Sequence, residues 1–292
     1  MIPKIYSNRP LARILIVGLL PCLNALFWLS LVSNGWVAMY SMHFICMLIF
    51  PMFVYGIRYI SNNIRDTVEY MKSFDLAKCI YVALFTSAIG TLSLLLLLEL
   101  SKANPTLNLI KIEDIKEGLY KQGIIKDPTH GLGLFALFSG IYFSLVNPVV
   151  EELFWRSFLY KELFTSLGYR GGTNLEHGCV LNEIGDNYMD FLLIREQSIH
   201  IFDKYSDVES GQKNMVGIGL IDITCSVLYS LYHFFVLIHF SSLSFSTLST
   251  ISLAIAGWVL LYISKRFHIM YSIYIHIGMD LSIILFSLLT MT

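Results

Sequence analysis

Mainly apolar stretches of about 20 residues recur along this chain, and no other feature limits its fold so strongly. A helix of that length crosses the hydrocarbon core of a bilayer. Charged residues make up only 14% of the 292 residues, whereas a soluble domain typically has about 25%. The sequence therefore predicts an all-α polytopic membrane protein with about seven transmembrane helices. We place these spans at roughly 11–33, 36–57, 78–100, 132–162, 222–242, 246–264 and 268–290.

Two polar segments divide the chain. The first, 101–131, contains five lysines and four acidic residues, and the second, 164–214, contains four basic and eight acidic residues. We therefore expect three membrane helices in 1–100 and an extracytoplasmic loop at 101–131. We expect a helical core at 132–292, which contains a cytoplasmic insertion at 164–214.

The basic residues of the short loops predict the orientation, because cytoplasmic loops of membrane proteins carry an excess of lysine and arginine. With a cytoplasmic N-terminus, most of them lie on the cytoplasmic side. The short turns on the other side, near 34–35 and 243–245, have no basic residue. The lysines of 101–131 run against this bias. The residues that set the orientation are Lys4, Arg9, Arg13, Arg58, Arg65, Lys72, Lys265 and Arg266.

Composition also limits the partners. The formal net charge is −1, so there is no basic excess of the kind that binds nucleic acid. The lipid bilayer is the partner that the apolar segments indicate. The five cysteines are scattered without a CxxC pair and no HExxH motif is present, so we expect neither a metal site nor a cofactor.

The fourth predicted span contains the residues that are most costly to place in a membrane. Glu151, Glu152 and Arg156 lie within it, and an ionisable residue inside a span is a functional hypothesis by default. Glu152 and Arg156 are four residues apart, so they share a helix face and can pair. Glu151 points about 100° away and has no such partner. The spacing predicts that Glu151 stays free for chemistry.

The dipeptide Asn147-Pro148 predicts a break in this span, because proline lacks an N–H group and clashes with the preceding helical turn. Asn147 is expected to cap a second half-helix, with Pro148 at its first position. Glu151 would then lie close to the positive end of the half-helix dipole.

Further ionisable residues occur in the later spans, where His233 lies in the fifth and His276 and Asp280 lie in the seventh. Tyr229 and His233 are four residues apart and so share a helix face, as do His276 and Asp280. Glu151, His233 and His276 lie about 12–17 Å from the cytoplasmic ends of their predicted spans. We expect these three groups to meet in a polar cavity that opens to the cytoplasm.

Each of these features also has a purely structural explanation. The pairing of Glu152 can be a simple helix anchor, and histidines such as His233 or His239 can be hydrogen-bonded core residues. Asp280 can act only to orient His276. Their joint occurrence at matched depth favours a functional site.

With these residues identified, the chain resembles the CPBP family of intramembrane glutamic endopeptidases, which comprises the CAAX prenyl endopeptidases and their bacterial relatives, the Abi family. The EExxxR motif of that family matches 151–156. Its FxxxH motif matches Tyr229 and His233, and its HxxxN or HxxxD motif matches His276 and Asp280. The order and spacing of three motifs make the resemblance specific.

The resemblance covers about 132–163 and 222–284 and has departures. Tyr229 replaces the phenylalanine of the second motif, and Trp155 and Ser157 replace the residues that are frequent beside the arginine. An aspartate at 280 cannot donate a hydrogen bond unless it is protonated.

The resemblance implies an endopeptidase that hydrolyses a membrane-associated protein or peptide without a covalent intermediate, in the cytoplasmic membrane of a bacterium. It implies that Glu151 and His233 activate a water molecule. It implies that His276, with Asp280, stabilises the developing oxyanion. The residues that it gives a supporting role are Glu152, Arg156 and Tyr229.

Three other functions are compatible with the same residues. The chain can be a non-catalytic membrane scaffold that retains the fold and binds partner membrane proteins. It can be a metal-dependent hydrolase with Glu151, His233 and His276 as ligands, which are acceptable zinc ligands. It can also be a proton-coupled transporter.

Overall fold

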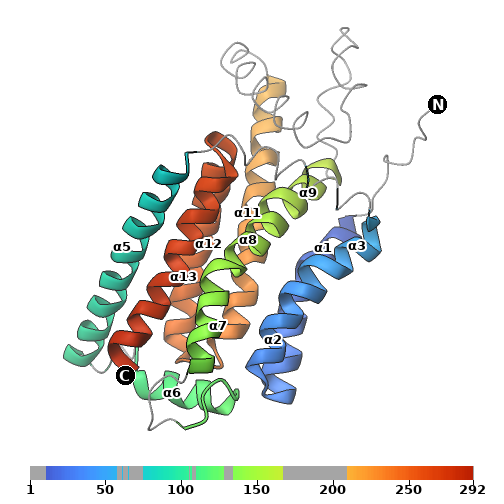
Figure 1. The fold of residues 1–292 in the computed structure, drawn as a ribbon. Helices are drawn as coiled ribbons and strands as arrows, with labels where there is room; N and C mark the ends of the chain where they lie inside the picture. The colour runs from blue at the N-terminus through green and yellow to red at the C-terminus, as the bar shows by residue number, and fades with distance from the viewer. Residues whose placement is uncertain are drawn as a thin grey trace.

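The computed structural model is a bundle of helices, and the described residues contain no strand (Figure 1). The residues that the structure describes are 11–57, 61, 65, 75–104, 106, 110–127, 134–166 and 209–291. Most of the predicted insertion at 164–214 falls outside this set. The predicted loop at 101–131 contains a helix of its own, α6 (Ile112–Lys121).

The N-terminal helices form an antiparallel pair in which each span contains a π-helical stretch (Figure 1). The turn between the spans places Ser33 in the left-handed region at φ 55°. Asn34 then caps the second span by accepting a hydrogen bond from the backbone N–H of Val37 at 3.0 Å. These elements are α1 (Leu11–Ala25), η1 (Leu26–Val32), α2 (Gly35–Ser41), η2 (Met42–Ile49) and α3 (Phe50–Tyr55).

Long apolar helices form the rest of the bundle. Polar side chains begin two of them, because Asp75 accepts a hydrogen bond from the N–H of Lys78 and Ser242 accepts one from the N–H of Phe245, each at 3.2 Å. In chain order these helices are α5 (Leu76–Ala103), α11 (Glu209–Leu237), α12 (Leu243–Arg266) and α13 (Ile269–Met291).

Six helices of the described chain are long and apolar enough to cross a membrane. The predicted all-α membrane fold is confirmed, but the predicted count of seven is wrong. The predicted span at 132–162 is interrupted at Val146 and contains five charged residues, so it is not a continuous apolar helix. It consists of α7 (Leu134–Leu145), α8 (Asn147–Glu152), the π-helix η4 (Leu153–Leu159) and α9 (Tyr160–Ser166).

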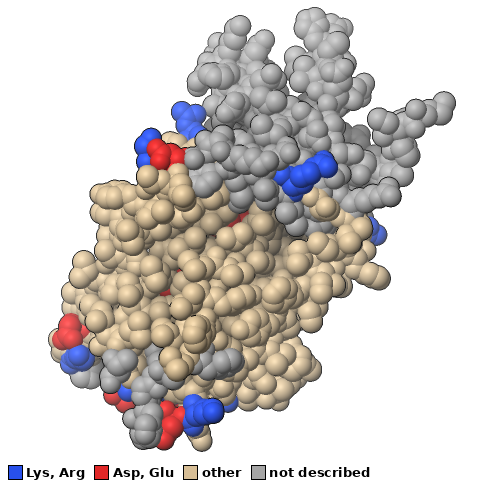
Figure 2. Space-filling model, in the orientation of Figure 1, with Lys and Arg blue, Asp and Glu red and all other residues tan. Residues whose placement is uncertain are grey.

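The surface agrees with a multi-pass membrane protein. On the face shown in Figure 2, most of the described lysine, arginine, aspartate and glutamate side chains lie at the two ends, and a broad band with almost no charged atoms lies between them. Large apolar side chains point outward from the helices, among them Leu31, 77% exposed, and Phe53, 87% exposed. Exposing such an apolar surface to water is unfavourable in free energy, whereas contact with lipid acyl chains is not.

The helices α5 and α13 pack in close backbone contact at Gly278. A Cβ atom at this position would overlap the carbonyl oxygen of Ala83 and would lie 2.8 Å from the Cβ of Thr86. At Gly90 a Cβ atom would lie 2.6 Å from the hydroxyl oxygen of Ser282. Small residues therefore set the separation of the two helices, as is common between membrane helices.

Replacing Gly278 by alanine should destabilise the protein by about 1–3 kcal/mol, because the helices must separate to admit the methyl group. Thermal unfolding of the detergent-purified protein measures this effect. Gly219→Ala is the matched control, because a Cβ atom on Gly219 in α11 would meet nothing within 4 Å. Equal melting temperatures for the two variants would contradict the role given to Gly278.

A candidate active site between α8, α11 and α13

The polar residues predicted from the sequence lie together inside the bundle. Helix α8 contributes two carboxylates that are at most 1% exposed. Helices α11 and α13 contribute the histidines and the third carboxylate. All of these residues except the partly buried His233 are almost fully enclosed, so the predicted cavity that opens to the cytoplasm stays a prediction. The predicted residues in this cluster are Glu151, Glu152, Arg156, Tyr229, His233, His276 and Asp280.

The break before α8 brings Asn147 to the site. Helix α7 ends at Leu145 and Pro148 lies in the first turn of α8, as the sequence predicted. The predicted cap is wrong, because Val146 occupies the capping position with helical angles of φ −92° and ψ −42° and has no side-chain hydrogen bond. The amide Nδ2 of Asn147 instead donates a hydrogen bond to Oδ2 of Asp280 at 2.9 Å. A tertiary partner thus replaces the local capping role.

Glu152 is the most heavily bonded carboxylate of the site. Its predicted partner Arg156 is confirmed, with Nε of the arginine 3.3 Å from Oε2 of Glu152. The hydroxyl of Ser272 donates to the same oxygen, and Nδ1 of His276 donates to Oε1 at 2.9 Å. Because a carboxylate accepts here, the hydrogen of the His276 ring lies on Nδ1. The ring nitrogen Nε2 is then directed toward Glu151.

The contact that orients His276 therefore comes from Glu152. Oδ1 of Asp280 lies 3.8 Å from Nε2 of His276, which is too long for a hydrogen bond. The other oxygen of Asp280 accepts from Asn147. The spacing of four residues does place Asp280 on the face of His276, but the carboxylate of the neighbouring helix approaches the ring more closely.

Glu151 has one bonded oxygen and one oxygen that faces His276. The hydroxyl of Tyr232, on another helix, donates a hydrogen bond to Oε1, a contact that the spacing within the fourth predicted span did not indicate. Oε2 has no hydrogen-bond partner among the described residues and lies 3.9 Å from Nε2 of His276. The hydroxyl of Tyr229 lies 3.5 Å from the same nitrogen. A single water molecule can bridge distances of this length.

His233 contacts Glu151 through Tyr232. Nδ1 of His233 donates a hydrogen bond to the carbonyl oxygen of Tyr229 at 2.9 Å. Nε2 lies 2.9 Å from the hydroxyl of Tyr232. Both ring nitrogens are therefore engaged, and a phenol stands between the imidazole and the carboxylate.

Sequence reasoning missed Tyr232 and Ser272. Tyr232 is adjacent to His233 and lies about 100° away on the helix, so the spacing of four residues that links Tyr229 and His233 gave no signal for it. Its ring is buried against Trp155, nearly parallel at an interplanar angle of 2° and a centroid distance of 5.9 Å. Ser272 is four residues before His276 and shares its face. That spacing was the available signal for Ser272.

Two further histidines, His43 and His239, are not among the predicted site residues, although His43 lies beside Asn147. His43 is buried on η2, with Nδ1 3.1 Å from the hydroxyl of Tyr142, and the sequence did not single it out. His239 was predicted within the fifth span, but α11 ends at Leu237. Nε2 of His239 lies 3.0 Å from the hydroxyl oxygen of Ser30.

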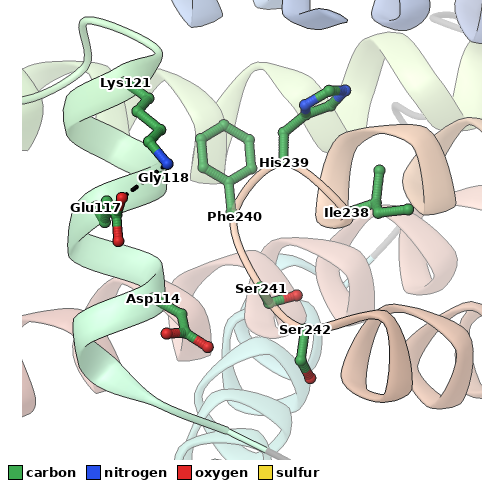
Figure 3. Close-up of a pocket in the computed structure, with 9 residues that line it drawn as sticks. All are labelled: Asp114, Glu117, Gly118, Lys121, Ile238, His239, Phe240, Ser241 and Ser242. Carbon is green, nitrogen blue, oxygen red and sulfur yellow. Dashed lines mark ion pairs between the residues drawn. The ribbon is translucent and has the colours of Figure 1, made fainter.

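A separate pocket of about 180 Å³ lies between α6 and the turn that joins α11 to α12 (Figure 3). At its edge Lys121 pairs with Glu117 at 2.7 Å, and this hydrogen bond lowers the pKa of the exposed Glu117 carboxyl. The pocket does not include the residues around Glu151. Its lining residues are Asp114, Glu117, Gly118, Lys121, Ile238, His239, Phe240, Ser241 and Ser242.

The arrangement gives no support to the metal ligand set considered from the sequence. In the described part of the chain, no group of three or more histidine, cysteine, aspartate or glutamate side chains is placed to hold a metal ion. Both nitrogens of His233 and one nitrogen of His276 already have partners. Ligation by Glu151, His233 and His276 would require these contacts to break.

Comparison with known proteins was made for the whole chain. No family model, curated protein or solved structure matches it. The resemblance noted from the sequence therefore depends on its three motifs, and the chemistry of the site is interpreted from its geometry.

Proposed function

We propose that this protein is an intramembrane glutamic endopeptidase that hydrolyses a peptide bond in a membrane-associated protein or peptide. One observation carries the proposal. Oε2 of a buried glutamate, Glu151, faces Nε2 of His276 at 3.9 Å, and each group is held by bonds at its other atom. A base and an electrophile close enough to contact the same water molecule are what water-mediated hydrolysis requires.

The first step is the activation of water. Oε2 of Glu151 accepts a proton from a water molecule placed between the carboxylate and His276. The oxygen of the resulting hydroxide attacks the carbonyl carbon of the substrate. This step forms a C–O bond and moves the electron pair of the C=O bond onto the oxygen.

The second step is stabilisation of the oxyanion. When His276 is protonated on both nitrogens, Nδ1–H remains bonded to Glu152 and Nε2–H donates to the oxyanion. The carboxylates of Glu151, Glu152 and Asp280 surround the ring within 3.9 Å and balance its positive charge. The hydroxyl of Tyr229, 3.5 Å from Nε2, is a second donor at the same position.

The last step releases the products. The proton held by Glu151 moves to the nitrogen of the leaving amine, the C–N bond breaks, and a carboxylic acid and an amine are formed. Asp280 accepts a hydrogen bond from Asn147. We therefore assign Asp280 to the charge balance of His276 and not to donation to the oxyanion.

The three motifs shared with CPBP endopeptidases support this function, and the basic residues support an orientation. Helix α1 begins and α12 ends at the same end of the bundle (Figure 1). Arg13, Lys265 and Arg266 lie at that end. We infer that this end, with the N-terminus, faces the cytoplasm, because basic loops are retained there. A bacterial cytoplasmic membrane is the location that the resemblance favours.

Hydrolysis in ¹⁸O-labelled water tests the function. The full chain, purified in detergent, is incubated with a library of quenched-fluorescence peptides, and the products are analysed by mass spectrometry. We expect new C-termini that carry one ¹⁸O atom in the first turnover, with a chelator present. Absence of cleavage, together with retained biological activity of a Glu151 variant, would favour the scaffold function. Activity that returns only with an added metal would favour the metal hydrolase.

A further inference from the structure

Three atoms form a row of two consecutive hydrogen bonds beside the proposed reaction centre. They are Oε1 of Glu151, the hydroxyl oxygen of Tyr232 and Nε2 of His233. Tyr232 is 2% exposed and its ring is stacked on Trp155. This packing fixes the position of the ring and therefore of its hydroxyl group. The mechanism proposed above uses Glu151 and its hydrogen bond from Tyr232, but it gives no role to the contact between Tyr232 and His233.

The number of protons in the row can be counted from its partners. Nδ1 of His233 carries a hydrogen, because its partner is the carbonyl oxygen of Tyr229 and a carbonyl can only accept. When Glu151 is ionised and His233 is neutral, the hydroxyl of Tyr232 has one hydrogen for two acceptors. Both neighbours of that hydroxyl nevertheless lie at hydrogen-bond distance. One added proton completes both hydrogen bonds.

We propose that Tyr232 couples Glu151 and His233 into one unit that holds a single shared proton. In one form His233 is an imidazolium that donates to Tyr232, and Tyr232 donates to the Glu151 carboxylate. In the other form Glu151 is a carboxylic acid that donates to Tyr232, and Tyr232 donates to neutral His233. The forms interconvert when the Tyr232 proton moves to Oε1 and the Nε2 proton moves to the tyrosine oxygen, so no proton is gained or lost.

This inference rests on the proposed function for its catalytic meaning. In the imidazolium form Glu151 is an ionised base, and its Oε2 faces His276. In the carboxylic acid form Glu151 already holds a proton, so it is a much weaker base toward water. His233 thus acts on Glu151 through Tyr232 and does not need to touch the water. We therefore regard Tyr232 and His233 as positioning residues for the base.

Infrared spectroscopy of the full protein tests proton sharing without any need for activity. The carbonyl-stretch band of protonated Glu151 is identified by its loss in Glu151→Gln, and its pH titration is then recorded. We expect this band to shift in frequency and to titrate differently in both Tyr232→Phe and His233→Gln. Tyr142→Phe is the matched control, because it removes a hydroxyl beside a buried histidine, His43, at 3.1 Å, and should leave the band unchanged. An identical band and titration in wild type and in Tyr232→Phe would overturn the proposal.

Kinetics provide a second readout. Tyr232→Phe keeps the ring on Trp155 and should lower kcat by about 100-fold, a typical loss for proton-transfer catalysis. The double variant Tyr232→Phe/His233→Gln should be no slower than either single variant, because both break the same link. Losses that multiply would contradict the coupling. If the wild type cleaves no peptide, the proposed function is wrong, whereas the infrared result still decides whether the proton is shared.

Discussion

Replacing Glu151 by glutamine is expected to abolish most peptide hydrolysis while the protein remains folded. The amide is close in size to the carboxylate, and its oxygen can still accept the hydrogen bond from Tyr232. It cannot take a proton from water. We expect kcat to fall by about 10²- to 10⁴-fold, the usual contribution of a general base, with little change in KM. Initial rates with the best peptide from the library measure this loss.

A second buried glutamate supplies the control for this variant. Glu162 on α9 is 2% exposed and is not among the residues assigned to the site. Glu162→Gln should retain wild-type kcat, and both variants should elute as the wild type in gel filtration. Full activity in Glu151→Gln would disprove the assignment of the base, and so would an equal loss in both variants.

Replacing Arg156 by methionine is expected to give the largest loss of stability. The side chain of Arg156 is 2% exposed and that of its partner Glu152 is fully buried, and the guanidinium also lies 4.2 Å above the ring of Tyr229. Removing the arginine leaves a buried carboxylate without its cation, which costs about 3–5 kcal/mol. Unfolding of the purified protein, followed by circular dichroism, measures the change.

Two further variants test this interpretation. In Glu152→Gln/Arg156→Met both charges are removed, so much of the stability should return. The exposed pair of Glu117 and Lys121 has the same spacing of four residues, and Lys121→Met should leave the melting temperature unchanged. A double variant as unstable as Arg156→Met would show that lost packing, not unpaired charge, causes the effect.

The membrane helices could be predicted from the sequence because length and apolar composition are local properties. The six spans agree with the prediction within a few residues. The break at Pro148 was also predicted, but the segment that contains it is not a continuous apolar helix, so the predicted count of seven spans was wrong. Local spacing also predicted the pair of Glu152 and Arg156. The contacts of Glu152 with Ser272 and of Glu151 with Tyr232 join different helices. They depend on which helix faces pack together, and local spacing in the sequence does not determine that.

Asn147 illustrates the same limit. Its residue type and its place before proline are typical of a helix cap, and the local pattern contains no sign of Asp280, which lies 133 positions later. A polar side chain in the membrane bonds to whichever group the bundle brings close, because water is not present to replace a missing partner. Local rules for polar residues are therefore least reliable at the centre of such a bundle.

Gly278 lies between His276 and Asp280, so the backbone contact that it makes with Ala83 lies at the same level as the reactive groups. On that side Gly278 lies directly against Ala83 and Thr86 of α5, which leaves no room for a lipid-embedded segment between the two helices. Under the proposed function, a membrane-embedded substrate is therefore expected to approach Glu151 along a different wall of the bundle. The smallest residue of α13 would then close one flank of the molecule to it.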